Sequence, residues 1–370
     1  MKVICDRAAL LDAATVVGSV TGGRTPSPVL RCMKLVATDG LLQLAATDLE
    51  MGLRISVPQV EVQEDGEAVV PADKLLQIVR TCDDSTLTLV SDGHALNIEG
   101  AGSHFKVYGF DPKEFPPVRD FSEATVDCQL KSRELQTLVT RTAFAAATEH
   151  SRYAINGLLF ERKGKKLRLV ATDGRRLAMA QGEVKGGQGD KSCIIPTKAM
   201  TLLIKLLRDP DETVRVAIEE NQVLFCAGED PGAAVLSSNL VEGAFPPFED
   251  VIPKDQDKKV SCDTALLLSA IRRAALLTNE ESRGVRMAFA DDKLTLTSRA
   301  PEMGEAEVEL ALDKYEGDPV EIGFNPGFIA DALKVVDGGK VIVELKAPNK
   351  PGVLRTGTDF TYVLMPVNLQ

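Results

Sequence analysis

The feature that most constrains the fold of this chain is a threefold internal repeat. Segments with one shared pattern, an alternating apolar run closed by a polar turn, occupy comparable places in three successive stretches: LLQLAATDLEMGLRI, KLRLVATDGRRLAMA and KLTLTSRAPEMGEAE. Leu44, Leu169 and Leu296 stand in register within them. The spacing from one of these leucines to the next is more than a hundred residues. This spacing matches the length of a whole domain and exceeds the repeat of a solenoid or a propeller. The chain is therefore expected to hold three copies of one domain.

Two proline-containing segments mark where the copies end. FPPV lies at 115–118 and FPPFEDVIP lies at 245–253. Each follows the last apolar run of a copy, and clusters of proline are typical of connecting segments. We interpret them as linkers, which places the domains at residues 1–121, 122–253 and 254–370.

Each copy doubles again, because a short apolar strand running into a helix start occurs twice within it. The six predicted helix starts carry a capping side chain or a proline, the residues favoured there: Asp6, Pro71, Ser132, Pro196, Asp263 and Pro326. Alternating runs such as TLTLVSD, TVRVAIEE and KVIVELKA follow, broken by Asp-Gly and Gly-Gly turn signals. The pattern predicts an α+β fold of six β-α-β-β-β units.

Composition indicates a cytoplasmic protein with reduced thiols. The chain has no apolar run long enough to cross a membrane, and its N-terminus, MKVICDRAALL, lacks the features of a signal peptide. Its seven cysteines are scattered and never take a CxxC spacing. Buried, reduced cysteines are the expected state.

The net charge of −11 argues against a nucleic-acid partner until its distribution is considered. The six predicted helices carry an excess of five positive charges, from Arg7, Lys74, Arg80, Arg133, Arg141, Lys198, Lys205, Arg208, Arg272, Arg273 and Lys334 against Asp6, Asp12, Asp73, Glu134, Asp263 and Asp331. A surface formed by all six helices would be basic within an acidic shell. Amphipathic helices also carry solvated lysines and arginines, so this pattern alone does not establish DNA binding.

The Thr-Asp pairs are the feature that most resembles an enzyme. Thr38-Asp39, Thr47-Asp48 and Thr172-Asp173 suggest carboxylates for Mg²⁺ and a metal-dependent phosphohydrolase. The equivalent position in the third copy is Ser298-Arg299, and an Asp after a strand ordinarily caps a turn. His94, His104 and His150 have no metal-ligand spacing, and no P-loop, GxSxG or GxGxxG motif occurs. We predict no catalytic residue, no metal site and no cofactor.

At the level of motifs the whole chain resembles one family. The segment LVATDGRRLA is preceded by RYAINGLLFE and followed by IIPTKAMTLL, FPPFEDVIP, NEESRGVR, IGFNPGFIADAL and TYVLMPVNL; GGRTPSPVL and ATDLEMGL occur in the first copy. In order and spacing this set is similar to the bacterial DNA polymerase III beta subunit, the replicative sliding clamp. One departure is the terminus Asn368-Leu369-Gln370, where the family often ends in a basic and then an apolar residue.

The resemblance implies three processivity-clamp domains per chain and a head-to-tail homodimeric ring, with helices inside and sheets outside. Such a ring encircles double-stranded DNA without sequence preference and tethers the replicative polymerase and other replication and repair proteins. It makes and breaks no bond. The implied partners are duplex DNA, the polymerase, a clamp loader and other proteins with clamp-binding motifs, with no membrane. A repeat-built scaffold that does not bind DNA is the remaining alternative.

The resemblance also implies three sets of site residues. The DNA-binding set is Arg24, Lys74, Arg141, Glu149, His150, Arg152, Tyr153 and Lys198. The partner-peptide pocket would be lined by Ile155, Thr172, Gly174, Arg175, Arg176, Leu177, Pro246, Val251, Asn325, Phe328, Val353, Met365 and Pro366. The dimer interface would join Lys74, Phe105 and Lys106 to Leu276, Leu277, Glu302 and Glu305.

Overall fold

The computed structural model describes residues 1–21, 25–147, 155–187, 189–229, 232–278, 284–301, 303–336 and 338–368. Within these ranges no helix is long and apolar enough to cross a membrane. The contacts divide the chain into two compact units. The first comprises residues 1–136, 184–189 and 198–240, and the second comprises residues 137–183, 190–197 and 241–370.

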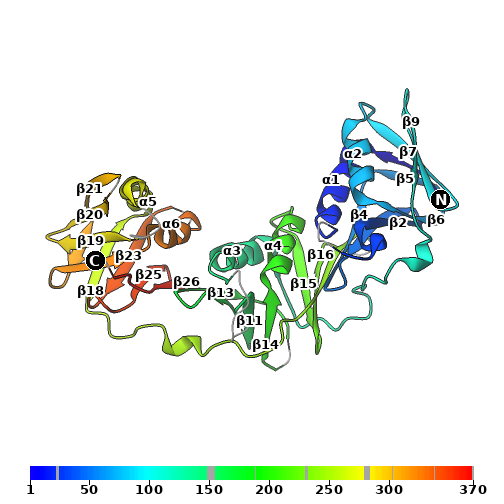
Figure 1. The fold of residues 1–370 in the computed structure, drawn as a ribbon. Coiled ribbons are helices and arrows are strands. Elements are labelled where there is room, and N and C mark those ends of the chain that lie inside the picture. Colours follow the sequence, from blue (N-terminus) through cyan, green and yellow to red (C-terminus); the bar gives the residue numbers. More distant parts are fainter. Residues whose placement is uncertain are drawn as a thin grey trace. The chain divides into compact units, whose positions relative to one another are not determined.

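The predicted sixfold β-α-β-β-β pattern is confirmed (Figure 1). The first repeat contains β1 (Lys2–Asp6), α1 (Arg7–Gly18), β2 (Cys32–Thr38), β3 (Leu41–Thr47) and β4 (Met51–Val57), then β6 (Gly66–Pro71), α2 (Ala72–Thr81), β7 (Thr86–Asp92), β8 (Ala95–Glu99) and β9 (His104–Tyr108). The second contains β10 (Cys128–Lys131), α3 (Ser132–Ala143), β11 (Gly157–Lys163), β12 (Lys166–Thr172) and β13 (Arg176–Glu183), then β14 (Lys191–Pro196), α4 (Thr197–Leu206), β15 (Thr213–Ile218), β16 (Gln222–Ala227) and β17 (Ala234–Asn239).

The third repeat contains β18 (Lys258–Asp263), α5 (Thr264–Ala274), β19 (Val285–Ala290), β20 (Lys293–Ala300) and β21 (Gly304–Ala311), then β23 (Val320–Phe324), α6 (Pro326–Lys334), β24 (Lys340–Leu345), β25 (Gly352–Thr356) and β26 (Phe360–Leu364). The sequence pattern did not predict two further strands, β5 (Val60–Glu64) and β22 (Lys314–Glu316). Short 3₁₀ helices are η1 (Pro28–Arg31), η2 (Pro112–Glu114), η3 (Phe248–Asp250) and η4 (Ala275–Leu277).

Local chemistry explains where the helices begin. The carboxylate of Asp6 accepts a hydrogen bond from Ala9 N at 2.8 Å, and that of Asp263 accepts one from Leu266 N at 2.9 Å. These bonds satisfy backbone donors that the first turn of a helix leaves without partners. In α6, Pro326 is the first helical residue and the side chain of Asn325 provides the cap. The expected capping is thus confirmed at Asp6, Asp263 and Pro326. Pro71 and Pro196 instead end the preceding strands, and the buried hydroxyl of Ser132, the first residue of α3, has no hydrogen-bond partner among the described residues.

Each unit contains two antiparallel sheets. The first unit holds a five-stranded sheet, β5-β1-β7-β8-β9, and an eight-stranded sheet, β10-β15-β16-β17-β4-β3-β2-β6. The second holds a nine-stranded sheet, β14-β11-β12-β13-β26-β25-β24-β18-β22, and a four-stranded sheet, β21-β20-β19-β23. The units thus follow shared sheets rather than the sequence repeats, because strands from consecutive repeats pair with each other.

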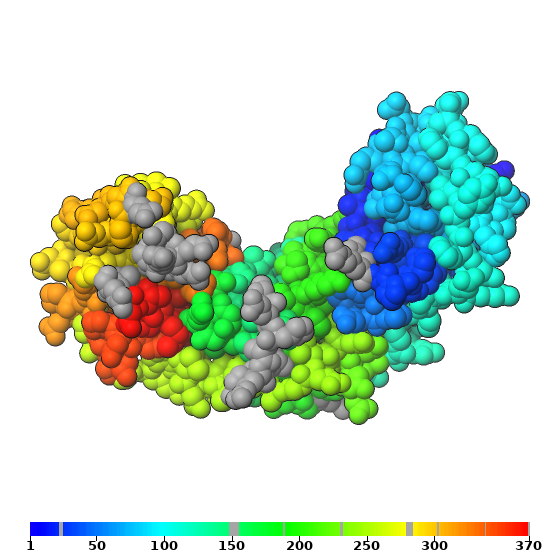
Figure 2. All heavy atoms as spheres, viewed as in Figure 1, coloured from blue at the N-terminus to red at the C-terminus, as the bar shows by residue number. Residues whose placement is uncertain are grey.

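Two such pairings, which we call seams, join consecutive repeats. β4 pairs with β17 in the first seam, and β13 pairs with β26 in the second. In the space-filling view, red atoms of the C-terminal segment adjoin green atoms of the central repeat (Figure 2). β21 is the strand of the third repeat that corresponds to β4 and β13, and β9 is the strand of the first repeat that corresponds to β17 and β26. Each of the two is the last strand of its sheet among the described residues.

Amphipathic helices cover the sheets and bury the core. In the first unit α1 and α2 lie side by side (Figure 1). Leu75 and Val79 of α2 are fully buried at a spacing of one helical turn, while Asp73 and Lys74 are exposed. Burying a side chain of this size contributes about 1.5–3 kcal/mol. In the second unit α5 and α6 pack together in the same way.

Candidate partner-binding pocket

The Thr-Asp turn between β12 and β13 is closed by its own side chains. Thr172 Oγ1 donates to the carbonyl of Arg176 at 2.7 Å and accepts from Gly174 N at 3.1 Å. The Asp173 carboxylate accepts from Arg175 N and Arg176 N at 2.9 and 3.0 Å. Gly174 has a φ of +83°, which favours glycine. The interpretation of this aspartate as a turn residue is confirmed.

The equivalent turn in the first repeat uses its aspartate in the same way. The Asp48 carboxylate accepts from Glu50 N at 3.1 Å and from Met51 N at 2.8 Å. Leu49 stands at the position of Gly174 and has a φ of +76°. Among the described residues, no group of three or more His, Cys, Asp or Glu side chains could hold a metal ion.

A linker lies across the second seam and builds an apolar cluster there. Phe248 of η3 is buried together with Leu159, Val170, Leu177, Ile194 and Val363 from the strands. Arg168 of β12 holds this linker in place. Its guanidinium lies 5.5 Å from the centroid of the Phe248 ring and 2.9 Å from the carboxylate of Glu249, and it also bonds Glu161.

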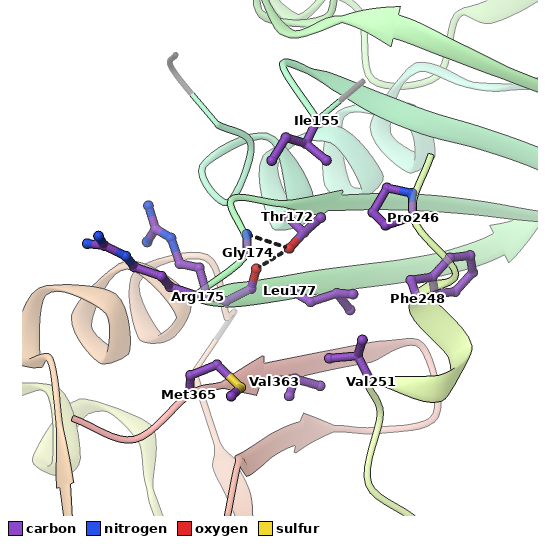
Figure 3. A pocket seen from close by; sticks show the side chains of 11 residues that line it. Ile155, Thr172, Gly174, Arg175, Leu177, Pro246, Phe248, Val251, Val363 and Met365 are labelled. Carbon is purple, nitrogen blue, oxygen red and sulfur yellow. Dashed lines mark hydrogen bonds between the residues drawn. The ribbon is translucent and has the colours of Figure 1, made fainter. Parts of the chain in front are cut away.

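The turn, the seam and the linker enclose a pocket with a volume of about 180 Å³ (Figure 3). The residues around it are predominantly apolar. They come from the segment before β11, from β12, β13 and the turn between them, from the end of β26 and from the linker: Ile155, Thr172, Gly174, Arg175, Arg176, Leu177, Pro246, Phe248, Val251, Val363 and Met365. Nine of the thirteen predicted pocket residues are brought together here. An apolar cavity with a few polar groups is the usual form of a ligand site.

Four predicted pocket residues do not line the cavity. Asn325 caps α6 through a 2.9 Å bond from Gly327 N, and the guanidinium of Arg176 lies over the Phe328 ring, 4.3 Å from its centroid. Val353 is fully buried in β25, where it pairs with Val363. Pro366 follows Met365 but is absent from the lining. The family resemblance thus named residues that neighbour the lining residues but do not belong to the lining.

Phe248 and Val363 line the pocket but were missed. A signal for Phe248 exists in the sequence, because it lies three residues before Val251, which is one turn of a 3₁₀ helix. Val363 lines the pocket because it pairs with Leu177 across the seam. That pairing joins residues far apart in the chain, so no local pattern indicates it.

Arg176 connects the pocket to two helices. Its guanidinium donates to Asp173 at 3.0 Å, to Asp331 of α6 at 3.0 Å and to the carbonyl of Phe144, just beyond α3, at 2.8 Å. The side chain is only 11% exposed. Burial opposes its charge, but the hydrogen bond to Asp331 and the neighbouring charges outweigh that effect, so the pKa of Arg176 is raised. Arg176 therefore stays charged and fixes the β13 end of the pocket.

Three family models match the chain in order. They describe the N-terminal domain of the DNA polymerase III beta subunit over residues 1–119, its central domain over 129–247 and its C-terminal domain over 249–368. The chain belongs to the DNA polymerase III beta subunit family.

Full-length relatives and solved structures agree. The beta sliding clamp of Vibrio cholerae is 34% identical over 372 residues and covers 100% of both chains, and that of Escherichia coli K12 is 34% identical over 91% of this chain and 90% of its own. The crystal structure of the Pseudomonas aeruginosa DNA polymerase III subunit beta superposes with a TM-score of 0.90 at 32% identity, and the Bacillus subtilis sliding clamp with 0.92 at 26%. Both cover 100% of either chain.

The function of the chain is accordingly that of a beta sliding clamp of DNA polymerase III, and the chain is a non-catalytic processivity factor. The alternative of a metal-dependent phosphohydrolase is wrong. Two of its three carboxylates, those of Asp48 and Asp173, accept backbone hydrogen bonds within turns, and Asp39 lies in the turn between β2 and β3 with a φ of +50°. All seven cysteines are buried, and none of them forms a disulfide in the described residues. Burial raises the pKa of Cys5 and of Cys262 to about 12, so these thiols stay protonated.

The structure describes three of the eight predicted DNA-binding residues. Lys74 and Lys198 are exposed, and Lys198 Nζ lies 2.6 Å from Asp48. Arg141 is a poorer candidate, because its side chain is 13% exposed, pairs with Asp359 at 2.8 Å and lies over the ring of Phe360. The others lie outside the described residues: Arg24, Glu149, His150, Arg152 and Tyr153.

The predicted interface residues lie on or beside two edge strands. Phe105 and Lys106 belong to β9, and Glu305 belongs to β21. Leu276 and Leu277 form η4, which contacts β20 and β21, and Leu276 is 73% exposed. Lys74 lies on α2, which contacts β9. Glu302 lies outside the described residues.

Proposed function

We propose that two copies of this clamp close head to tail into a ring around duplex DNA, through β9 of one copy and β21 of the other. The observation that carries this proposal is the equivalence of strands. Within the chain, each last strand of a repeat (β17, β26) pairs with the strand that ends the first β-α-β-β-β unit of the preceding repeat (β4, β13). β9 and β21 are the equivalent strands, and each ends its sheet among the described residues.

The number of strands in each sheet supports this pairing. The two seams create sheets of eight and nine strands, and joining the five-stranded sheet to the four-stranded sheet would create a third of nine. Open edge strands are exposed templates for pairing, and proteins normally cover them. Ring closure would cover both edges, and a contact between unlike surfaces that closes on itself produces a ring.

Charge and apolar surface at the two edges are complementary. Glu305, Glu307 and Glu309 make β21 acidic, while Lys106 on β9 provides a positive charge, which pairs with Asp92 at 3.0 Å within the chain. Leu276 beside β21 is the most exposed leucine in the described residues. Opposite charges orient an encounter, and a buried apolar anchor contributes most of the affinity.

DNA would be held by topology rather than by base recognition. The predicted helices carry the excess of positive charge in an otherwise acidic chain, and Lys74 and Lys198 are exposed on α2 and α4. Contacts of lysine and arginine with phosphates are independent of sequence and weaken with salt. A ring with such a lining would slide along the duplex, whereas a scaffold without DNA contact would not remain on it.

The pocket would bind short peptides of the replicative polymerase, of the clamp loader and of other replication and repair proteins. A tethered polymerase stays at a high effective concentration near the primer end, which accounts for processivity without chemistry in the clamp. An apolar lining with a few polar groups suits a peptide ligand. Because the relatives are bacterial proteins, we infer that the clamp acts in the cytoplasm.

Replacing Leu276 with Asp tests ring closure. The wild-type clamp should sediment as a dimer, at twice the chain mass of 39.8 kDa. A charge placed at a buried anchor should weaken the dimer by about 2 kcal/mol or more, roughly thirtyfold in Kd. Leu266→Asp is the matched control, because Leu266 of α5 is also exposed, at 57%, but lies outside the predicted interface. A monomeric wild type, or equal dissociation of the two variants, would contradict the proposal.

A further inference from the structure

The polar groups of the pocket are mostly used within the protein. Thr172 bonds the backbone of its own turn, and Arg176 bonds Asp173, Asp331 and the Phe144 carbonyl. Arg175 differs from both. Its side chain is exposed, and in the described part of the chain its guanidinium has no ion pair. Arg175 is therefore the charge that the lining offers to a ligand.

The linker contributes acidic side chains at another part of the rim. In a 3₁₀ helix, residues three apart lie on one face, and Phe248 and Val251 both line the pocket. Glu249 and Asp250, between them, therefore flank that face. Glu249 is paired with Arg168. Among the described residues Asp250 forms no ion pair and is exposed, so it provides a negative charge at the rim.

Arg175 and η3, the helix that carries Asp250, lie at opposite ends of the pocket. In the close-up, Arg175 and Met365 lie on one side, whereas Pro246, Phe248 and Val251 lie on the other, with Leu177 and Val363 between them (Figure 3). An extended ligand that crosses the pocket would thus pass from a positive end, at Arg175, over an apolar floor to a negative end, at η3.

We propose that the pocket selects its ligand by charge polarity: it prefers a peptide with an apolar centre, an acidic group at the Arg175 end and a basic residue at the η3 end. This inference rests on the proposed function, since it specifies the chemistry of the partner segment. Arginine is suited to a carboxylate because its fork of donors matches the two oxygens. The cavity of about 180 Å³ takes a side chain of ring size, since an apolar cavity of about 150 Å³ holds benzene.

Four fluorescent peptides with one Leu-Phe centre test the proposal. One peptide has Lys at its N-terminal end and Glu at its C-terminal end, one has the reverse order, one has Lys at both ends and one has Glu at both ends. Fluorescence anisotropy gives the Kd of each peptide for the full-length clamp. One of the two mixed peptides should bind most tightly, because a peptide crosses the pocket in one direction. An exposed ion pair contributes little, so each favourable end should lower Kd only about 1.5- to 5-fold. Raising the ionic strength from about 0.1 to about 1 M should remove the preference.

Matched variants assign each end. Arg175→Gln should remove the preference for the acidic end and Arg175→Lys should keep most of it. Asp250→Asn should remove the preference for the basic end and Asp250→Glu should keep it. Equal Kd values for all four peptides, or preferences that survive in Arg175→Gln and Asp250→Asn, would refute the charge polarity. Failure of every peptide to bind would instead refute the peptide pocket itself.

Discussion

Replacing Arg176 with Met should lower the local stability of the second unit around the pocket, in α6 and β26. Methionine keeps an apolar stem but removes three hydrogen bonds, to Asp173, Asp331 and the Phe144 carbonyl. It also removes the cation that lies 4.3 Å from the centroid of the Phe328 ring. Each of these contacts has a charged donor in a largely buried site.

The expected magnitude follows from the burial of the partners. Removing one member of a buried ion pair costs about 3–5 kcal/mol, because the other charge is left without compensation. Asp331 is 34% exposed and keeps its ion pair with Lys334 at 3.0 Å, which favours the lower end of that range, about 3 kcal/mol. Arg176→Lys keeps the charge but loses the planar fork, so about half of this loss is expected.

Hydrogen exchange measured by mass spectrometry is the suitable assay, because a chain of several sheets is not expected to unfold in one step. A loss of about 3 kcal/mol should speed exchange of the amides of α6 and β26 roughly a hundredfold. Arg175→Met is the control, since this neighbouring side chain is exposed and its loss should change stability by less than about 0.5 kcal/mol.

Two outcomes would refute this reasoning. Exchange in α6 that is the same for Arg176→Met and Arg175→Met would show that the network does not stabilise the unit. In a double-mutant cycle with Asp331→Asn, a coupling energy near zero would show that the contact between the two side chains contributes nothing; about 1–2 kcal/mol is expected.

Two further predictions concern acid stability and the first seam. Burial opposes the charge of Glu161, but hydrogen bonds from Lys163 and Arg168 lower its pKa. The ionised Glu161 carboxylate should therefore stabilise the fold fully above its ordinary pKa of 4.5, and this stabilisation should be lost as pH falls through the lower pKa of the folded state. In Glu161→Gln, the free energy of unfolding measured with urea should fall less steeply as the pH is lowered. Gly52→Ala should cost about 1–3 kcal/mol by thermal unfolding, because a Cβ there would lie 2.8 Å from Val118 Cγ1; an unchanged midpoint would contradict this.

Local patterns in the sequence were sufficient for the repeat, the helix starts and the turns. Asp6 and Asp263 cap helices because a short carboxylate reaches free backbone donors within three residues, and such physics can be read locally. The two added strands show the limit: β22 has only three residues, too few for an alternating pattern.

Long-range pairing could not be read from the sequence. Nothing local indicates that β13 pairs with β26, so Val363 was missed as a pocket residue. The resemblance also named Val353, which is fully buried in β25 beside its partner Val363 and does not itself line the cavity. The sequence thus indicated the site through its turn and its linker. The pairing of β13 with β26, which forms the floor of the pocket, could be seen only in the structure.

The central claim, a closed ring that holds DNA by topology, is tested most directly by linearising loaded DNA. The clamp is loaded on a nicked circular plasmid with a clamp loader, the complex is separated from free protein, and half of it is cut once with a restriction enzyme. The account predicts that the clamp stays on the circle, leaves the linear DNA, and is retained again when both ends carry tightly bound protein. Equal retention on circular and cut DNA would contradict it.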